Sequence, residues 1–320
     1  MFDKIVTSGV IFSDGMHNAF PSVCRFGGAL YIAFRSGKGH LYFDGVIKLM
    51  RSCDEGKSWE FVRSFSAEED LRDPRLLVID GKLHLYSGMR YSGRSRSLRL
   101  ETRHWISADG ADFEEVPLKG VPSNTFFWGF ALRNNSIVGT GYRCDGEIAN
   151  CVASLYCSSD GRNWELFREL DIAGGNEVAL DLDAAGTLHG IVRRDIPPFT
   201  PIAFSLAPEG DIQYRELPLA MQGIMLKCVG DGFLIAARRW DGAERRDLRC
   251  DYFRCTRSGE LSLAGRLPSA GDCSYAACTE LKDGKLLVIY YSSHNHWDKR
   301  DGMADPEHGL PADICFAIME

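Results

Sequence analysis

The sequence has no apolar run long enough for a membrane-spanning helix, no linker rich in proline, glycine or serine, and no basic and apolar leader at its N-terminus. Without an apolar run we expect no membrane partner, and without a linker we expect one domain over residues 1–320. The first residues include Asp3, so the sequence predicts a cytoplasmic protein. With 45% hydrophobic residues and 33 glycines, the chain can form a core and many turns.

The cysteines also lack a pattern. There are 11 of them, an odd number, and no Cys-x-x-Cys pair occurs. This scatter predicts neither a disulfide framework nor a zinc cluster, so we expect reduced thiols. The net charge of −7 argues against a general nucleic-acid partner, and an anionic ligand would need a local cluster of arginines.

One motif recurs about every 50 residues, clearest as Ser-Cys-Asp-Glu-Gly-Lys-Ser-Trp from Ser52 to Trp59. Weaker copies lie at 107–113 and 158–164, and an eroded copy lies at 256–259. Serine and aspartate can hydrogen-bond the backbone of a tight turn, glycine accepts a positive φ, and the aromatic residue can pack on the core. The repetition therefore predicts a repeated structural unit.

Short apolar runs joined across a tight turn give the number of units. Six such turns lie near 27–28, 80–81, 134–135, 185–186, 231–232 and 283–284, again about 50 residues apart. This spacing predicts an all-β fold, a six-bladed β-propeller of four-stranded antiparallel blades, with the motif joining the third strand to the fourth. The last blade lacks a strand before Glu320, so we expect the segment from Lys4 to Phe12 to supply its outer strand.

Asp-turn motifs on six blades resemble the Asp-box repeats of the sialidase (neuraminidase) superfamily. In that family a glutamate at the start of a blade polarises a tyrosine nucleophile, and an arginine sixteen residues later binds the substrate carboxylate. The resemblance assigns these roles to Glu177, Tyr275 and Arg193. A neutral phenol suits a sugar whose anomeric carbon carries a carboxylate, because an anionic nucleophile would be repelled. Alternatively, Glu177 and Arg193 are a solvated surface pair and Tyr275 is a packed residue.

The resemblance places the general acid on a loop of the first blade, where Asp44 lies within the glycine-rich segment 36–45. A plain turn aspartate before Gly45 is the alternative for Asp44.

The arginines depart from the family pattern. Ala19 stands where the family carries the first arginine of its carboxylate clamp, which indicates a divergent branch. The remaining substrate-binding candidates are Arg239, Arg72 and Arg35, with Asp73 beside Arg72. Bidentate arginine suits a carboxylate, although many surface arginines only solvate a blade edge.

Two further segments carry weaker signals. Trp128, at the start of the third blade, is predicted to pack in the core or to stack on a sugar. The basic run from Arg90 to Arg103 is predicted to form an exposed loop.

Together these features predict a sialidase-like retaining exo-glycoside hydrolase that cleaves a terminal acidic sugar and needs no metal or organic cofactor. We expect a carbohydrate partner and a monomer or weak homo-oligomer. Two alternatives stay open: a propeller glycosidase or lyase acting on another sugar through Asp73, Asp44 and Glu177, and a non-catalytic propeller that binds glycans or proteins.

Overall fold

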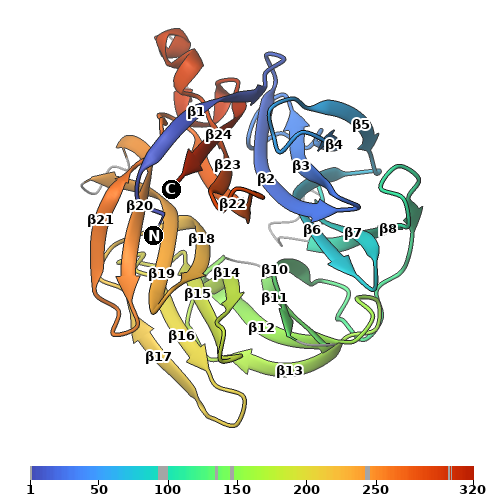
Figure 1. Ribbon diagram of the computed structural model, residues 1–320, viewed down its shortest axis with the longest axis vertical. Coiled ribbons are helices and arrows are strands. Elements are labelled where there is room, and N and C mark those ends of the chain that lie inside the picture. The colour runs from blue at the N-terminus through green and yellow to red at the C-terminus, as the bar shows by residue number, and fades with distance from the viewer. Residues whose placement is uncertain are drawn as a thin grey trace.

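The structure is a computed structural model that describes residues 2–92, 100–133, 136–144, 148–241, 246–301, 303 and 305–320. Within these residues, 24 strands form six four-stranded antiparallel sheets arranged as blades around a central axis (Figure 1). The predicted all-β, six-bladed propeller is therefore confirmed. Among the described residues, no helix is long and apolar enough to cross a membrane.

Each blade begins with its innermost strand. Blade 1 contains β2 (His17–Phe26), β3 (Ala29–Gly37), β4 (Val46–Ser52) and β5 (Glu60–Phe65). Blade 2 contains β6 (Asp70–Ile79), β7 (Lys82–Arg90), β8 (Leu100–Ser107) and β9 (Glu114–Glu115). Blade 3 contains β10 (Phe126–Arg133), β11 (Ser136–Cys144), β12 (Cys151–Ser158) and β13 (Glu165–Leu170).

The remaining blades repeat this order. Blade 4 contains β14 (Gly175–Leu182), β15 (Leu188–Arg194), β16 (Ile202–Leu206) and β17 (Ile212–Glu216). Blade 5 contains β18 (Gln222–Val229), β19 (Gly232–Asp241), β20 (Arg246–Thr256) and β21 (Leu261–Arg266). Blade 6 contains β22 (Cys273–Glu280), β23 (Leu286–Ser292), β24 (Asp313–Met319) and β1 (Ile5–Phe12). The short helices are η1 (Ile148–Asn150), η2 (His294–Arg300) and α1 (Pro306–Gly309).

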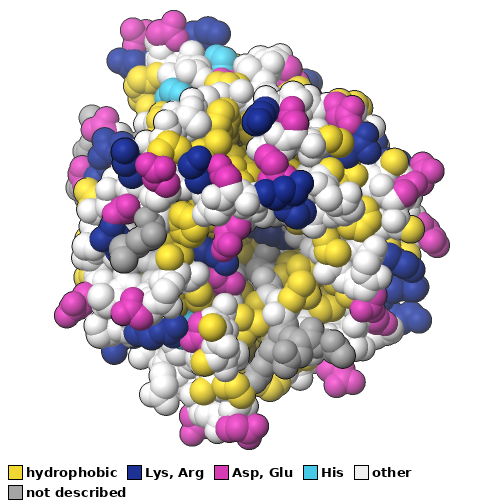
Figure 2. Space-filling model, in the orientation of Figure 1, with side chains coloured by type: hydrophobic (Ala, Val, Ile, Leu, Met, Phe, Trp, Pro, Cys, Tyr) yellow, Lys and Arg dark blue, Asp and Glu magenta, His cyan; other side chains and the backbone are white. Residues whose placement is uncertain are grey.

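The N-terminal strand completes the last blade. β1 pairs antiparallel with β24, with Ile5 opposite Met319, so the predicted outer strand is confirmed. This pairing joins the two ends of the chain and closes the ring. Figure 2 shows one face of the ring, which is hollowed at its centre.

The Asp-turn motifs connect the third and fourth strands of blades 1 to 3, as predicted. In the third copy, Ser158 Oγ accepts a hydrogen bond from Gly161 N at 2.9 Å and donates one to Asp160 Oδ1 at 3.1 Å. Gly161 has a φ of +70°, and Trp164 is 2% exposed. Trp164 packs in the core cluster between blades 2 and 3, so the motif stabilises a junction between blades.

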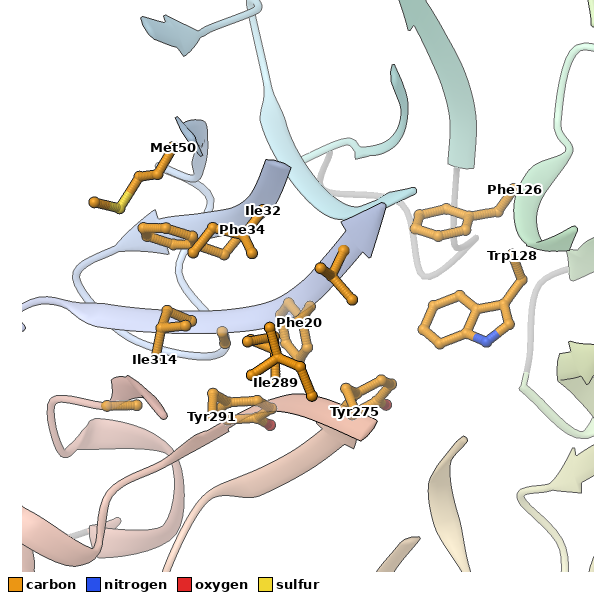
Figure 3. Packing of buried hydrophobic residues seen from close by; sticks show 14 of the residues in the cluster. Phe20, Ile32, Phe34, Met50, Phe126, Trp128, Tyr275, Ile289, Tyr291 and Ile314 are labelled. Carbon is orange, nitrogen blue, oxygen red and sulfur yellow. The ribbon is translucent and has the colours of Figure 1, made fainter. Parts of the chain in front are cut away.

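The hydrophobic core is divided among the junctions. Six clusters of buried residues lie between neighbouring blades, because each sheet buries both faces against the adjacent sheets. The cluster between blades 6 and 1 extends to the axis through Phe20, Tyr275 and Trp128 (Figure 3).

Each innermost strand carries a β-bulge at the same level of the ring. Two residues at each bulge lie outside the regular register: 20–21, 73–74, 128–129, 176–177, 223–224 and 275–276. Phe20, Asp73 and Tyr275 have φ values of +57°, +51° and +49°, a region that few non-glycine residues adopt. Bulges redirect side chains at the rims of closed sheets, and here they deliver side chains to the axis.

The basic run from Arg90 to Arg103 was predicted to form an exposed loop, and this prediction was wrong at both of its ends. Arg90 ends β7 and Arg103 lies within β8. Residues 93–99, between these strands, lie outside the described residues. The predicted turn at 134–135 also lies outside them, although Arg133 and Ser136 on either side of it are paired.

Candidate active site

A cavity of about 280 Å³ lies at the axis, and five of the six blades contribute to its lining. Its lining residues are His40, Leu41, Arg72, Asp73, Arg90, Leu100, Phe126, Tyr142, Cys144, Cys151, Asn176, Glu177, Arg193, Asp195 and Tyr275. Five predicted site residues are therefore brought together: Tyr275, Glu177, Arg193, Arg72 and Asp73.

Tyr275, Glu177 and Arg193 form a compact triangle. The Tyr275 hydroxyl donates a hydrogen bond to Glu177 Oε1 at 3.0 Å. Arg193 Nη1 lies 2.8 Å from the same carboxylate oxygen and 2.7 Å from Tyr275 Oη. A phenol beside a carboxylate can pass it a proton, and the guanidinium can stabilise the negative charge that develops on the phenol oxygen.

Burial shapes the protonation of this triangle. It raises the pKa of Tyr275 above the ordinary tyrosine value, against the lowering effect of Arg193. It also raises the pKa of Glu177, with Arg193 opposing the shift and Asp73 adding to it. Glu177 Oε2 is buried without a hydrogen-bond partner among the described residues, so this carboxylate is incompletely satisfied. Such a group is a better proton acceptor than a fully hydrogen-bonded carboxylate.

Asp195, which the sequence analysis missed, orients Arg193. Its Oδ1 accepts hydrogen bonds from Arg193 Nε at 2.9 Å and from Gln222 Nε2 at 2.8 Å. Its Oδ2 accepts one from Asn176 Nδ2 at 2.9 Å. Arg193 Nη2 has no hydrogen-bond partner among the described residues, so one edge of this guanidinium can receive a ligand.

Asp73 faces the cavity from the bulge of blade 2. It is 6% exposed, and its Oδ2 lies 3.2 Å from Arg72 Nε. Burial raises the pKa of Asp73, against the lowering effects of Arg72 and Arg75. Arg72 also contacts Asp70 at 3.5 Å and stacks over the Phe20 ring at 5.1 Å.

Neither Asp44 nor Arg35 lines the cavity. Asp44 accepts hydrogen bonds from Lys38 N and lies 3.8 Å from Arg35 Nη2. Arg35 is fully buried and donates to Asp70 Oδ1 and to the carbonyls of Gly39 and Tyr42. Both side chains hold the loop between β3 and β4 in place.

The arginine of blade 5 that approaches the site is Arg238, the neighbour of the predicted Arg239. Successive side chains on β19 point to opposite faces. Arg239 donates to Ala220 O and does not line the cavity. Arg238 lies over the Tyr275 ring at 5.5 Å and donates to Asp272 Oδ1 at 3.0 Å.

Trp128 packs against Tyr275 and does not line this cavity. Its ring meets the Tyr275 ring edge-on, with centroids 5.5 Å apart (Figure 3). Arg75 stacks on the face of the Trp128 ring at 4.2 Å. Trp128, Arg75 and Tyr275 also line a second cavity further along the axis. Of the two predictions for Trp128, the structure favours core packing.

Two histidines meet a buried carboxylate at the edge of the cavity. His17 Nε2 and His40 Nδ1 lie 2.7 and 2.5 Å from Asp272 Oδ2. Burial lowers the pKa of His40 to about 3 and also lowers that of His17, so both rings are neutral near pH 7. These three side chains have metal-ligand chemistry, but the distances are those of hydrogen bonds, and Arg238 already balances the charge of Asp272.

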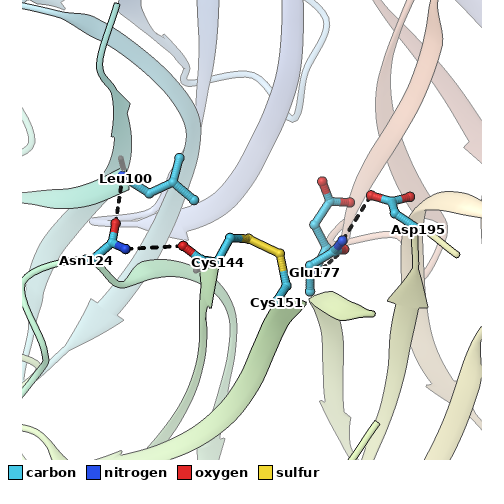
Figure 4. Close-up of a disulfide and its surroundings, with 7 residues drawn as sticks. Leu100, Asn124, Cys144, Cys151, Glu177 and Asp195 are labelled. Carbon is cyan, nitrogen blue, oxygen red and sulfur yellow. Dashed lines mark hydrogen bonds between the residues drawn. A yellow bond between two sulfur atoms is a disulfide. The ribbon is translucent and has the colours of Figure 1, made fainter. Parts of the chain in front are cut away.

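Cys144 and Cys151 form a disulfide in the cavity wall, which corrects the expectation of reduced thiols throughout (Figure 4). The two residues are directly opposite each other on β11 and β12, with Cα atoms 4.0 Å apart. No sequence motif marks them, because their proximity depends on the register of this strand pair.

Comparisons with known proteins agree with this fold. No family model matches the chain, and no curated protein matches it in sequence. The chain is similar over 99% of its length to a protein of unknown function from Dyadobacter fermentans DSM 18053, covering 98% of that chain at 17% identity with a TM-score of 0.79. Penicillium chrysogenum α-L-arabinanase gives 14% identity and a TM-score of 0.68, over 99% of this chain and 98% of that one.

Trypanosoma rangeli sialidase, in complex with the inhibitor DANA, gives 14% identity and a TM-score of 0.65. The match covers 99% of this chain and 58% of the sialidase. At such identities a likeness establishes the fold alone. The chain has a six-bladed β-propeller fold, and this fold is similar to that of Trypanosoma rangeli sialidase.

Proposed function

We propose that the protein is a retaining exo-glycoside hydrolase that cleaves a terminal acidic sugar, a sialic acid or a related ulosonic acid. The observation that carries the proposal is the contact of 3.0 Å between Tyr275 Oη and Glu177 Oε1, inside a cavity that three arginines line. A binding propeller needs no buried tyrosine–carboxylate pair at its axis, so this geometry favours the hydrolase over the non-catalytic alternative.

In the first step, Tyr275 Oη attacks the anomeric carbon and its proton passes to Glu177 Oε1. The bond to the leaving oxygen breaks, and an acid on the opposite wall protonates that oxygen. In the second step, water attacks the anomeric carbon and gives a proton to the conjugate base of that acid, and the bond from this carbon to Tyr275 Oη breaks. Glu177 returns its proton to Tyr275, so both groups are regenerated.

We assign the acid to Asp73 in place of Asp44. Asp73 lines the cavity with Glu177 and Tyr275, and burial raises its pKa, which favours the protonated form that the first step needs. Asp44 is turned toward Lys38 and Arg35, outside the lining. The alternative enzyme, with Asp73, Asp44 and Glu177 acting together, loses support for the same reason.

The free edge of Arg193 supports an acidic sugar. Its Nη2 has no partner among the described residues and lies on the guanidinium that contacts Tyr275, where an anomeric carboxylate would sit. Arg72 supplies a second cation in the lining. Arg238 is occupied by Asp272 and Tyr291, so we infer a clamp of fewer than three arginines.

Turnover of aryl glycosides by a Tyr275→Phe variant tests the proposal. The substrates are aryl glycosides of sialic acid, related ulosonic acids and uronic acids. We expect the wild type to cleave an acidic member and the variant to lose about 10³-fold or more in kcat, because the nucleophilic oxygen is gone.

The matched control is Tyr290→Phe. Tyr290 is a buried tyrosine on neighbouring β23 whose hydroxyl donates to Pro268 O. This variant should keep nearly full turnover. Unchanged turnover in a folded Tyr275→Phe protein would exclude the mechanism.

A further inference from the structure

Arg90 differs from the other two arginines in the cavity lining. Arg193 is paired with Glu177 and Asp195, and Arg72 with Asp73 and Asp70. Arg90 has no carboxylate within 4.0 Å in the part of the chain that the structure describes. Arg90 is therefore the arginine of the lining that has no ion pair among the described residues.

Arg90 lies where the cavity opens to the surface. It is the last residue of β7, and its guanidinium lies 4.9 Å from the centre of the Phe43 ring. Phe43 belongs to an exposed apolar stretch of the loop between β3 and β4, where Leu41, Tyr42 and Phe43 are 49%, 56% and 42% exposed. Leu41 and Arg90 both line the cavity, so this corner joins the cavity to the surface.

The setting of Arg90 is unfavourable unless an anion binds there. Burial lowers its pKa, the neighbouring Arg72 lowers it further, and Asp70, which lies beyond ion-pair distance, only partly opposes these shifts. A partly buried cation without a carboxylate loses hydration that no ion pair repays. An arginine stacked on an aromatic face is also held in a fixed plane, with its N–H groups free along the edge for a bidentate acceptor.

The proposed reaction fixes which part of a substrate would reach this corner. The terminal sugar must lie with its anomeric carbon against Tyr275, among Glu177, Arg193 and Asp73. The remainder of the substrate, beyond the bond that breaks, must leave through the mouth. Arg90 lies on the wall that carries Asp73, the residue assigned to protonate the leaving oxygen, since β6 and β7 are paired strands.

We propose that Arg90 and Phe43 form a subsite for an acid group on the leaving portion of the substrate. The substrate class is then an acidic oligosaccharide in which the sugar next to the terminal one carries a carboxylate, sulfate or phosphate. The acid group accepts hydrogen bonds from Arg90, and the sugar ring lies along the apolar stretch 41–43. This inference rests on the proposed hydrolase, because the reaction defines which portion leaves.

An Arg90→Gln variant tests the subsite with two probes that share a terminal sugar. One is the methylumbelliferyl glycoside of N-acetylneuraminic acid, whose leaving group is neutral. The other is a dimer of N-acetylneuraminic acid, whose leaving group carries a carboxylate. We expect kcat/KM for the dimer to fall about 10- to 100-fold, the effect of a lost charge-assisted hydrogen bond, and kcat/KM for the aryl glycoside to change less than about 2-fold.

Arg143→Gln is the charge-matched control. Arg143 lies near the end of β11, pairs with Glu169 and does not line the cavity, so its loss should affect neither probe. An equal loss on both probes in Arg90→Gln, or an equal loss in the control, overturns the subsite.

Equilibrium binding of the dimer separates this inference from the proposed function. Calorimetry compares the Tyr275→Phe protein with the Tyr275→Phe/Arg90→Gln protein, so no turnover is needed. Weaker binding by 10-fold or more in the double variant supports the subsite even where the wild type cleaves neither probe, a result that would reject the hydrolase alone. Equal binding by the two proteins, including no binding by either, overturns the subsite.

Discussion

The two ends of the blades are built in opposite ways. At the end that carries the Asp-turns, the hydrogen bonds within the motif are local: Ser158, Asp160 and Gly161 bond residues two or three positions away. Tyr86 of the neighbouring blade adds one bond to Gly161 O. At the end that carries the cavity, the contacts join distant parts of the chain. Tyr275 and Glu177 are 98 positions apart, and His17 and Asp272 are 255 apart. One end repeats a local turn, and the other assembles one site.

This difference between the two ends shows that the residues that stabilise the blades are not the residues that form the candidate site. The same bulge recurs in all six blades, but its residues differ from blade to blade. The first residues at the six bulges are Phe20, Asp73, Trp128, Asn176, Gly223 and Tyr275. A repeated backbone therefore holds an unrepeated set of side chains, as expected for a function placed on a common fold.

The largest expected effect is at the site end. We expect Asp73→Asn to lower kcat on substrates with a poor leaving group by about 10²- to 10⁴-fold, because the proton donor is removed. Asp44→Asn, the matched change outside the cavity, should cost less than about 5-fold. Steady-state kinetics on an alkyl glycoside measures both. The reverse order would return the acid role to Asp44.

The next effect concerns pH and stability. Burial lowers the pKa of His40 from 6.5 in its ordinary state to about 3. Between pH 6.5 and pH 3, His40 binds a proton in the unfolded chain but not in the folded protein. The free energy of unfolding therefore keeps its full value above about pH 6.5 and falls as the pH is lowered below it. We expect a loss of about 2 kcal/mol between pH 6.5 and pH 5 from one such histidine.

Urea unfolding at several pH values measures this slope, and His40→Gln should flatten it. Asp272 and Arg72 are the charged groups that act most strongly on His40. Equal slopes in wild type and variant would show that His40 does not contribute to the acid sensitivity.

The smallest expected effect is at the turn end. Asp160 accepts hydrogen bonds from Ser158 Oγ, Arg162 N and Asn163 N, so Asp160→Ala should lower the unfolding free energy by about 1 kcal/mol. Turnover should stay within about 2-fold of wild type, since Asp160 takes part only in the turn. Denaturant titration and kinetics on the same preparation check both statements. A large loss of turnover in Asp160→Ala would contradict the conclusion that the Asp-turn end takes no part in catalysis.

The sequence predicted most of the frame and part of the site. The repeated turns gave the blade number and the closing strand, because turn chemistry depends on neighbouring residues. They also gave a register, in which Glu177, Arg193 and Tyr275 occupy corresponding places. The sequence named Arg239 where the structure places Arg238, because side-chain direction could not be predicted. These arginines are adjacent, and the pairing of β18 with β19 decides which one turns toward Tyr275.

Other features had no local signal. Asp44 lies on the expected loop, but it contacts Arg35 and Lys38 and does not line the cavity. The sequence offers Asp73 as a candidate site residue, and its approach to the axis depends on the bulge and its positive φ. The disulfide between Cys144 and Cys151 likewise depends on strand register.

The sequence by itself determined the blades, their number and the level of the ring at which Glu177 and Tyr275 stand, because these follow from short-range turns repeated along the chain. Tertiary structure alone decided that Tyr275, Glu177 and Arg193 share one hydrogen-bonded cluster and that Arg90 is left unpaired among the described arginines of the cavity. The physical reason is distance along the chain: residues from different blades meet only when the ring closes and the bulges turn their side chains to the axis.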